Sequence, residues 1–247
     1  MEGIYLRATR KMITIACAIM GVIFLIGCKK TVKIEKALQK VAEEKVEGET
    51  VISAYTSILE EYKKNITMST RPVRYKLIYL NNDDIPELAV IEDDIRAAGA
   101  QLYYCTDGEA QLLTAIHNDS ELDSYGCYGQ FTYNEREGIV KSYYERNGGA
   151  GYFNNICFWN GDKEMSILKE YSLDIIYGEA QDDFDKVTQT YFIDGEKVSA
   201  EAFSDLCKQW DSEHEKTFYY GDEDSMAIYA DTNVWQSLIE CWSTMRK

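Results

Sequence analysis

Residues 75–88 read YKLIYLNNDDIPEL, and this stretch decides the fold class. An apolar run leads into the polar segment 81–84, and a second apolar run starts after Pro86. Two such runs around a polar turn are typical of paired β-strands, which we expect at 74–80 and 87–92. Strands joined by so short a turn must pair antiparallel.

The same pattern recurs toward the carboxyl terminus and indicates further hairpins. Asp-Gly or Asn-Gly pairs at 107–108, 160–161 and 194–195 supply the positive φ angles that tight turns need. The strands expected around these and the remaining turns are 101–105, 110–113, 130–134, 139–144, 152–159, 165–171 and 188–193. The predicted result is an antiparallel meander.

Helical patterns flank the strands. After Thr50, apolar residues recur at helical spacing at Ile52, Tyr55, Ile58, Leu59 and Tyr62. Ser199 is suited to cap a helix over 200–210, and a last helix is expected over 233–245. The predicted class is α+β, an antiparallel β-meander sheet with an N-terminal amphipathic helix and C-terminal helices.

The amino terminus has the layout of a secretory signal. Arg7, Arg10 and Lys11 precede an apolar run over 12–26, which is followed by Gly27 and Cys28. As a helix this run spans about 22 Å, short of the roughly 30 Å hydrocarbon core of a bilayer. This length favours a cleaved signal over a permanent transmembrane helix.

The tetrad Leu25-Ile26-Gly27-Cys28 resembles the lipobox of bacterial lipoproteins. The resemblance implies cleavage before Cys28 and attachment of acyl chains such as palmitate to that cysteine. Two or more acyl chains give stable anchoring. The expected location is therefore the extracytoplasmic face of the cell membrane, with an uncleaved short anchor as the alternative.

These features divide the chain into a signal peptide at 1–27, a charged tether at 28–48 and a single globular domain at 49–247. Cleavage leaves 23 basic and 41 acidic residues, so the mature chain carries a net charge of −18. Such a charge repels phosphate backbones and excludes a nucleic-acid partner. With 45% hydrophobic and 13% aromatic residues, the chain has enough apolar surface to fold.

The 75–88 stretch also resembles a strand-turn-strand motif of uncharacterised secreted and lipidated proteins of Gram-positive bacteria. Their turn reads Asp-x-Asp-Gly-Asp-Gly, then an apolar residue, Pro, Glu and Leu, and the likeness covers 55–90. It implies a calcium-like loop with Asn81, Asp83, the Ile85 carbonyl and Glu87 as donors.

Several positions depart from that motif. Tyr79 and Asn81 replace its first two aspartates, and Asn82 and Asp84 stand where glycines belong. Calcium takes six to eight oxygens, and this loop offers too few. We therefore expect a polar hairpin turn, with a calcium-stabilised surface module kept as an alternative and no other cofactor.

Five cysteines lie outside the signal and the lipid site, at Cys105, Cys127, Cys157, Cys207 and Cys241. Their spacing lacks a CxxC pair, which argues against zinc. Most lie in apolar patterns, so buried free thiols are expected, and one disulfide remains open.

The remaining groups of acidic, glycine, histidine and aromatic residues do not specify one reaction or ligand. Acidic clusters occur at 92–94, 182–185 and 222–224, where paired carboxylates could in principle hydrolyse glycosides. The Gly-rich segment 147–151 lacks the features of a phosphate-binding loop, and His117 and His214 are the only imidazoles. An aromatic set is expected mainly in the core, with a sugar-binding face as the alternative: Tyr143, Tyr144, Tyr152, Phe153, Phe158, Trp159, Tyr219 and Tyr220.

With no catalytic set in view, the sequence predicts a non-catalytic domain that binds an extracellular ligand or protein partner. A carboxylate-based cell-wall or glycan hydrolase is the alternative. The ligand itself has no signature in the sequence.

Overall fold

The computed structural model describes residues 48–67, 71–95, 98–117, 120–146, 151–177 and 187–245. The chain divides into two compact units between Glu49 and Thr50, and the fold below is that of the second unit. The signal, the lipobox tetrad and the tether lie outside the described residues.

The first sheet contains the hairpin that the 75–88 stretch predicts. Strands β1 (Val73–Ile78) and β2 (Glu87–Ile91) pair antiparallel, with Leu77 opposite Leu88. The strand order is β14-β1-β2-β3-β4, where β3 is Gln101–Thr106, β4 is Glu109–Leu112 and β14 is Met226–Ile228.

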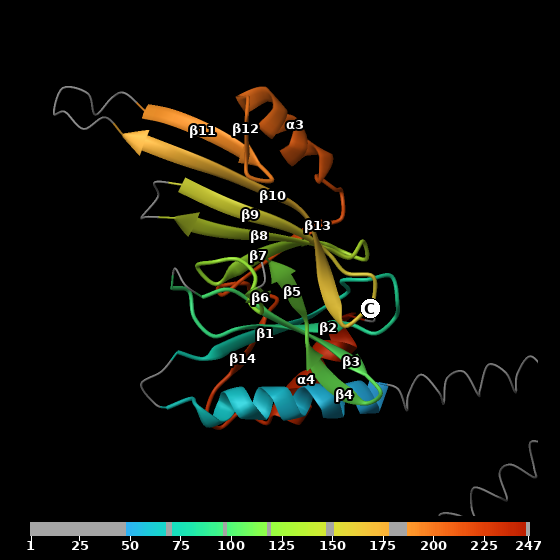
Figure 1. The fold of residues 1–247 in the computed structure, drawn as a ribbon. Helices are drawn as coiled ribbons and strands as arrows, with labels where there is room; N and C mark the ends of the chain where they lie inside the picture. The colour runs from blue at the N-terminus through green and yellow to red at the C-terminus, as the bar shows by residue number, and fades with distance from the viewer. Residues whose placement is uncertain are drawn as a thin grey trace, which may run out of the picture. The chain divides into compact units, whose positions relative to one another are not determined.

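The second sheet is larger and is built mainly from consecutive hairpins (Figure 1). Its main order is β12-β11-β10-β9-β8-β7-β13; β5 pairs with β10, and β6 pairs with β5. The strands are β5 (Thr114–His117), β6 (Ser120–Leu122), β7 (Gln130–Asn134), β8 (Ile139–Arg146), β9 (Gly151–Phe158), β10 (Glu164–Tyr177), β11 (Val187–Ile193), β12 (Glu196–Val198) and β13 (Glu215–Tyr219).

Three helices occur in the described ranges. The first covers 48–64 and is called the amino-terminal helix below. The others are α3 (Ala200–Gln209) and α4 (Val234–Met245). Ser199 caps α3 as predicted, because its hydroxyl oxygen accepts a hydrogen bond from the Ala202 amide at 3.1 Å.

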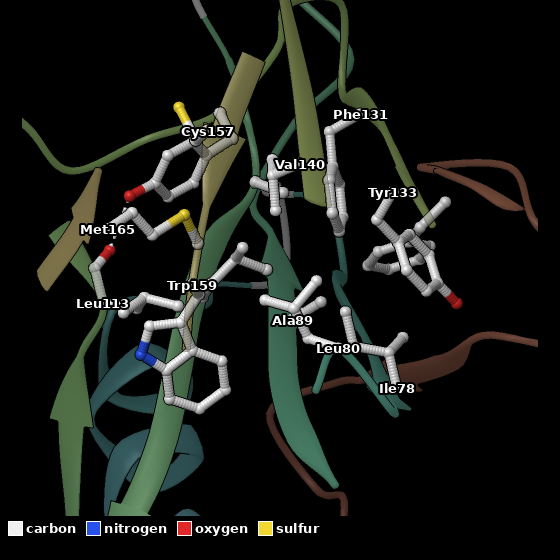
Figure 2. Packing of buried hydrophobic residues seen from close by; sticks show 14 of the residues in the cluster. Ile78, Leu80, Ala89, Leu113, Phe131, Tyr133, Val140, Cys157, Trp159 and Met165 are labelled. Carbon is white, nitrogen blue, oxygen red and sulfur yellow. Dashed lines mark hydrogen bonds between the residues drawn. The ribbon is translucent and has the colours of Figure 1, made fainter. Parts of the chain in front are cut away.

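The first sheet lies between two hydrophobic cores, with the amino-terminal helix and α4 on one face and the second sheet on the other (Figure 1). Tyr55, Leu77 and Leu238 belong to the core on the helical side. Ile78, Val140 and Trp159 belong to the core between the sheets, and Figure 2 shows this packing from close by. All five residues of β2 are buried, because this strand is covered on both faces.

The α+β class is confirmed, but a single meander does not describe the sheets. The strands form two sheets, and β13 and β14 pair with β7 and β1, which lie far earlier in the chain. Strand β5 pairs parallel with β10, a geometry that no hairpin can produce. These pairings depend on packing between distant segments, for which short-range patterns carry no signal.

The tight turns and the cysteines agree with the sequence-based predictions better than the sheet topology does. Asp107 and Gly108 have φ angles of 52° and 80°, and Asp194 and Gly195 have 49° and 81°. Two successive positive φ angles are what a tight primed turn requires. None of the five cysteines of the described domain forms a disulfide; Cys127, Cys157 and Cys241 are buried as expected, whereas Cys105 and Cys207 are half-buried.

A candidate ligand-binding groove

The structure places the three side chains among the four predicted calcium donors in different environments. Asn81 and Asp83 stay in the exposed turn, where the Asn81 side-chain amide donates to Asp83 Oδ2 at 2.7 Å. Asp83 Oδ1 accepts from the Ile85 amide at 2.8 Å. Both side chains therefore form hydrogen bonds within the turn, as Asn and Asp commonly do.

Glu87 lies in the core with only 2% of its surface exposed. Its Oε2 accepts a hydrogen bond from the Leu80 amide at 2.6 Å, so the carboxyl group closes the turn from inside. Burial raises the pKa of Glu87 well above its ordinary value, and the hydrogen bond from Leu80 opposes that rise.

An arginine provides a positive charge beside this turn. The guanidinium of Arg136 lies 4.1 Å from the centre of the Tyr79 ring and donates to the Asp83 carbonyl at 2.9 Å. The Arg136 amide also donates to the Tyr79 carbonyl at 2.9 Å. The ring of Tyr79 therefore supports a cation–π contact with Arg136.

Among the described residues, no group of three or more His, Cys, Asp or Glu side chains could hold a metal ion. In that same part of the chain, no helix is long and apolar enough to cross a membrane.

A groove not anticipated from the sequence lies at the end of the amino-terminal helix. Two cavities of about 370 and 420 Å³ share Tyr62, Asn65 and Glu92 in their walls. We call them together the Tyr62 groove, lined by Ile58, Glu61, Tyr62, Lys64, Asn65, Ile66, Arg71, Val73, Glu92, Asp93 and Tyr103. These volumes fall in the range of small-molecule sites.

Two tyrosines from distant segments meet in this groove. The Tyr62 and Tyr103 hydroxyl oxygens are 2.8 Å apart, and the rings meet edge to face at 6.4 Å between centroids. Tyr62 also donates a hydrogen bond to the side-chain oxygen of Gln101. Either hydroxyl can be the donor in the hydrogen bond between the two tyrosines.

The tyrosines are neutral hydrogen-bonding groups at physiological pH. Burial raises the pKa of Tyr62 and of Tyr103, and the nearby carboxylates Glu92 and Asp123 raise both further. A phenol in this state is poorly suited to act as a nucleophile or general base near neutral pH.

The charges of the groove are only partly paired. Lys64 forms an ion pair with Glu61, and Arg71 lies 3.4 Å from Asp93 and also contacts Asp94. Glu92 is exposed and forms no ion pair with any described residue.

Among the described residues, the acidic cluster at 222–224 lines neither cavity of the Tyr62 groove. Asp222 is buried and paired with Lys76 at 3.0 Å, and 182–185 lie outside the described residues. The segment 147–150 is also outside them. His214 is exposed, and only the backbone of His117 is described.

The aromatic set divides between core and surface. Trp159 is buried, as expected, whereas Phe158 and Tyr219 are exposed. Tyr143 and Tyr152 are half-buried on the second sheet, with ring centroids 5.3 Å apart. The sequence had placed Tyr62 on a core-facing stripe and Glu92 in an acidic cluster, and nothing in either pattern linked them to Tyr103.

No family model, curated protein or solved structure in the three comparisons matches this chain.

Proposed function

We propose that this chain is a membrane-anchored extracytoplasmic lipoprotein whose globular domain binds a ligand or protein partner without catalysis. The lipobox-like tetrad supports the anchor, and the motif at 75–88 supports a place among the lipidated Gram-positive proteins that share it. The observation that carries the binding function is the Tyr62 groove, with two neutral tyrosines in its wall.

A carboxylate-based cell-wall or glycan hydrolase is the second candidate, because Glu61, Glu92 and Asp93 line the same groove. A general acid of this kind needs a raised carboxyl pKa. Among the described carboxyl groups, the pKa is raised at Glu87, which lines neither cavity. This separation favours binding over hydrolysis.

The anchor is tested by replacing the cysteine that would carry it. Expression of the full chain with labelled palmitate in a Gram-positive host should label the wild-type protein and leave Cys28→Ser unlabelled. Cys17→Ser provides the matched control and should keep the label, since Cys17 lies within the predicted signal. Label retained in Cys28→Ser, or a mature mass that still includes 1–27, would contradict lipidation.

The binding function is tested with a panel of glycans, peptidoglycan fragments, peptides and amino acids, by thermal shift and product analysis on the full chain. A ligand at 100 times its Kd stabilises by about 2.7 kcal/mol. For a domain of this size, that corresponds to roughly 5–10 °C in Tm. We expect at least one ligand to shift Tm without being consumed, and calcium or its chelator to leave Tm unchanged.

Asn65→Trp should abolish the ligand-induced shift, because Asn65 is exposed in the wall of the groove and the indole would fill it. Asn82→Trp places the same side chain in an exposed turn outside the groove and should preserve the shift. Turnover of a glycan would instead support the hydrolase, and a calcium-dependent rise in Tm would support the calcium module.

A further inference from the structure

The hydrogen bonds of the two tyrosines indicate which kind of ligand group can bind to them. Tyr62 donates to Gln101, and the two hydroxyls share one hydrogen bond in which either can be the donor. In both arrangements the Tyr103 oxygen keeps at least one lone pair that can accept a hydrogen bond from a ligand. The pair therefore presents acceptor capacity and suits a ligand that donates hydrogen bonds.

The charged side chains of the groove favour the same kind of ligand. Lys64 and Arg71, the two cations of the lining, each contact an acidic side chain. Glu92 lines both cavities and forms no ion pair within the described residues. Glu92 and Asp123 also raise the pKa of both tyrosines, so both carboxylates add a negative contribution to the potential at the pair.

The backbone adds to this potential. The amino-terminal helix ends at residue 64, and Lys64 and Asn65 line the groove. The carboxyl end of a helix carries a partial negative charge of about half an electron, which favours cations. An anionic ligand would meet both this end and the Glu92 carboxylate.

We propose that the Tyr62 groove binds an organic cation, an ammonium or guanidinium group on the ligand, with Glu92 as its counter-ion. The Tyr103 oxygen accepts a hydrogen bond from the same ligand, and the combined cavities accommodate a group of amino-acid size. This assignment rests on the proposed binding function and names the chemistry of its ligand.

The test compares charged and neutral probes of nearly the same shape. Nα-acetyl-lysine methylamide and Nα-acetyl-arginine methylamide carry the cation, and Nα-acetyl-norleucine methylamide lacks it. Calorimetric titration of the full chain in detergent at low salt should show at least one cationic probe binding at least about tenfold more tightly than the norleucine probe. Added salt should weaken this preference, because screening acts on exposed charges.

Glu92→Gln should weaken binding of the cationic probe by about tenfold and leave the norleucine probe unaffected, since the amide keeps the size of the side chain and removes its charge. Glu109→Gln is the matched control and should keep wild-type affinity. Glu109 belongs to the β3–β4 hairpin, whose Gly108 lies beside Thr50 at the opposite end of the amino-terminal helix.

Equal affinity for charged and neutral probes, no binding of either cationic probe, or an unchanged affinity in Glu92→Gln would overturn the assignment. A neutral glycan that binds and is excluded by Asn65→Trp would overturn it too, while leaving the binding function in place. Failure of the whole ligand panel would instead count against the binding function.

Discussion

Replacing Trp159 by alanine is expected to lower the free energy of unfolding by about 3–5 kcal/mol, the usual cost of truncating a large core aromatic residue. Trp159 is 3% exposed and belongs to the core between the two sheets. Its ring lies 5.4 Å from that of Tyr104, and its indole N–H donates to the Asp162 carbonyl at 2.6 Å. The substitution therefore opens a cavity and leaves that carbonyl without its donor.

Trp235→Ala is the matched control, since Trp235 is 40% exposed at the start of α4. We expect this variant to lose less than about 1 kcal/mol, as exposed substitutions usually do. Denaturant unfolding of both variants, followed by circular dichroism, measures the difference. Equal losses would mean that the core between the sheets does not hold the domain together.

Glu87 should make the domain less stable as the pH rises from mildly acidic to neutral. Burial raises the folded-state pKa of Glu87 above its ordinary value of 4.5, so the folded protein holds this proton at a pH where the unfolded chain has released it. Its contribution is therefore complete below the ordinary pKa and is lost as the pH rises toward the raised one. The slope for one proton approaches about 1.4 kcal/mol per pH unit.

Glu87→Gln isolates this effect, because the amide oxygen still accepts from Leu80 and the side chain no longer titrates in this range. We expect the unfolding free energy of wild type, relative to Glu87→Gln, to fall with pH between about 4.5 and neutrality. The comparison removes groups such as Asp194, whose pKa is lowered by a hydrogen bond from Lys169 and whose pH effect has the opposite sign. A difference that stays constant with pH would contradict a raised pKa at Glu87.

Glu109→Gln also controls the pH experiment, because Glu109 is exposed on β4. Its unfolding free energy should differ from that of wild type by a similar small amount at every pH. A pH-dependent difference in this variant would assign the slope to general charge repulsion.

Local patterns predicted the hairpins well, because a turn and its two strands are neighbours in the chain. The antiparallel pairing of β1 with β2 and the positive φ angles of Asp107 and Gly108 followed from such patterns. The cap at Ser199 followed from its position before a helical stripe. Strands β13 and β14 were missed, because their partners β7 and β1 lie far away in sequence.

The same local patterns did not predict the candidate groove. Tyr62 sits on the apolar stripe of its helix and is indistinguishable there from a core residue. Its hydroxyl partner Tyr103 comes from β3 and is 41 residues away. Glu92 follows β2, so helix and sheet must pack before the groove exists.

The sequence by itself determined the α+β class, the main hairpins and the Ser199 cap of α3, because each depends on residues a few positions apart. It also carries the lipobox-like tetrad at Cys28, on which the proposed anchor rests. Only the tertiary structure decided the division into two sheets, the burial of Glu87 and the meeting of Tyr62 with Tyr103. Those features depend on which distant apolar faces bury one another, and that choice is made by the packing of the whole domain.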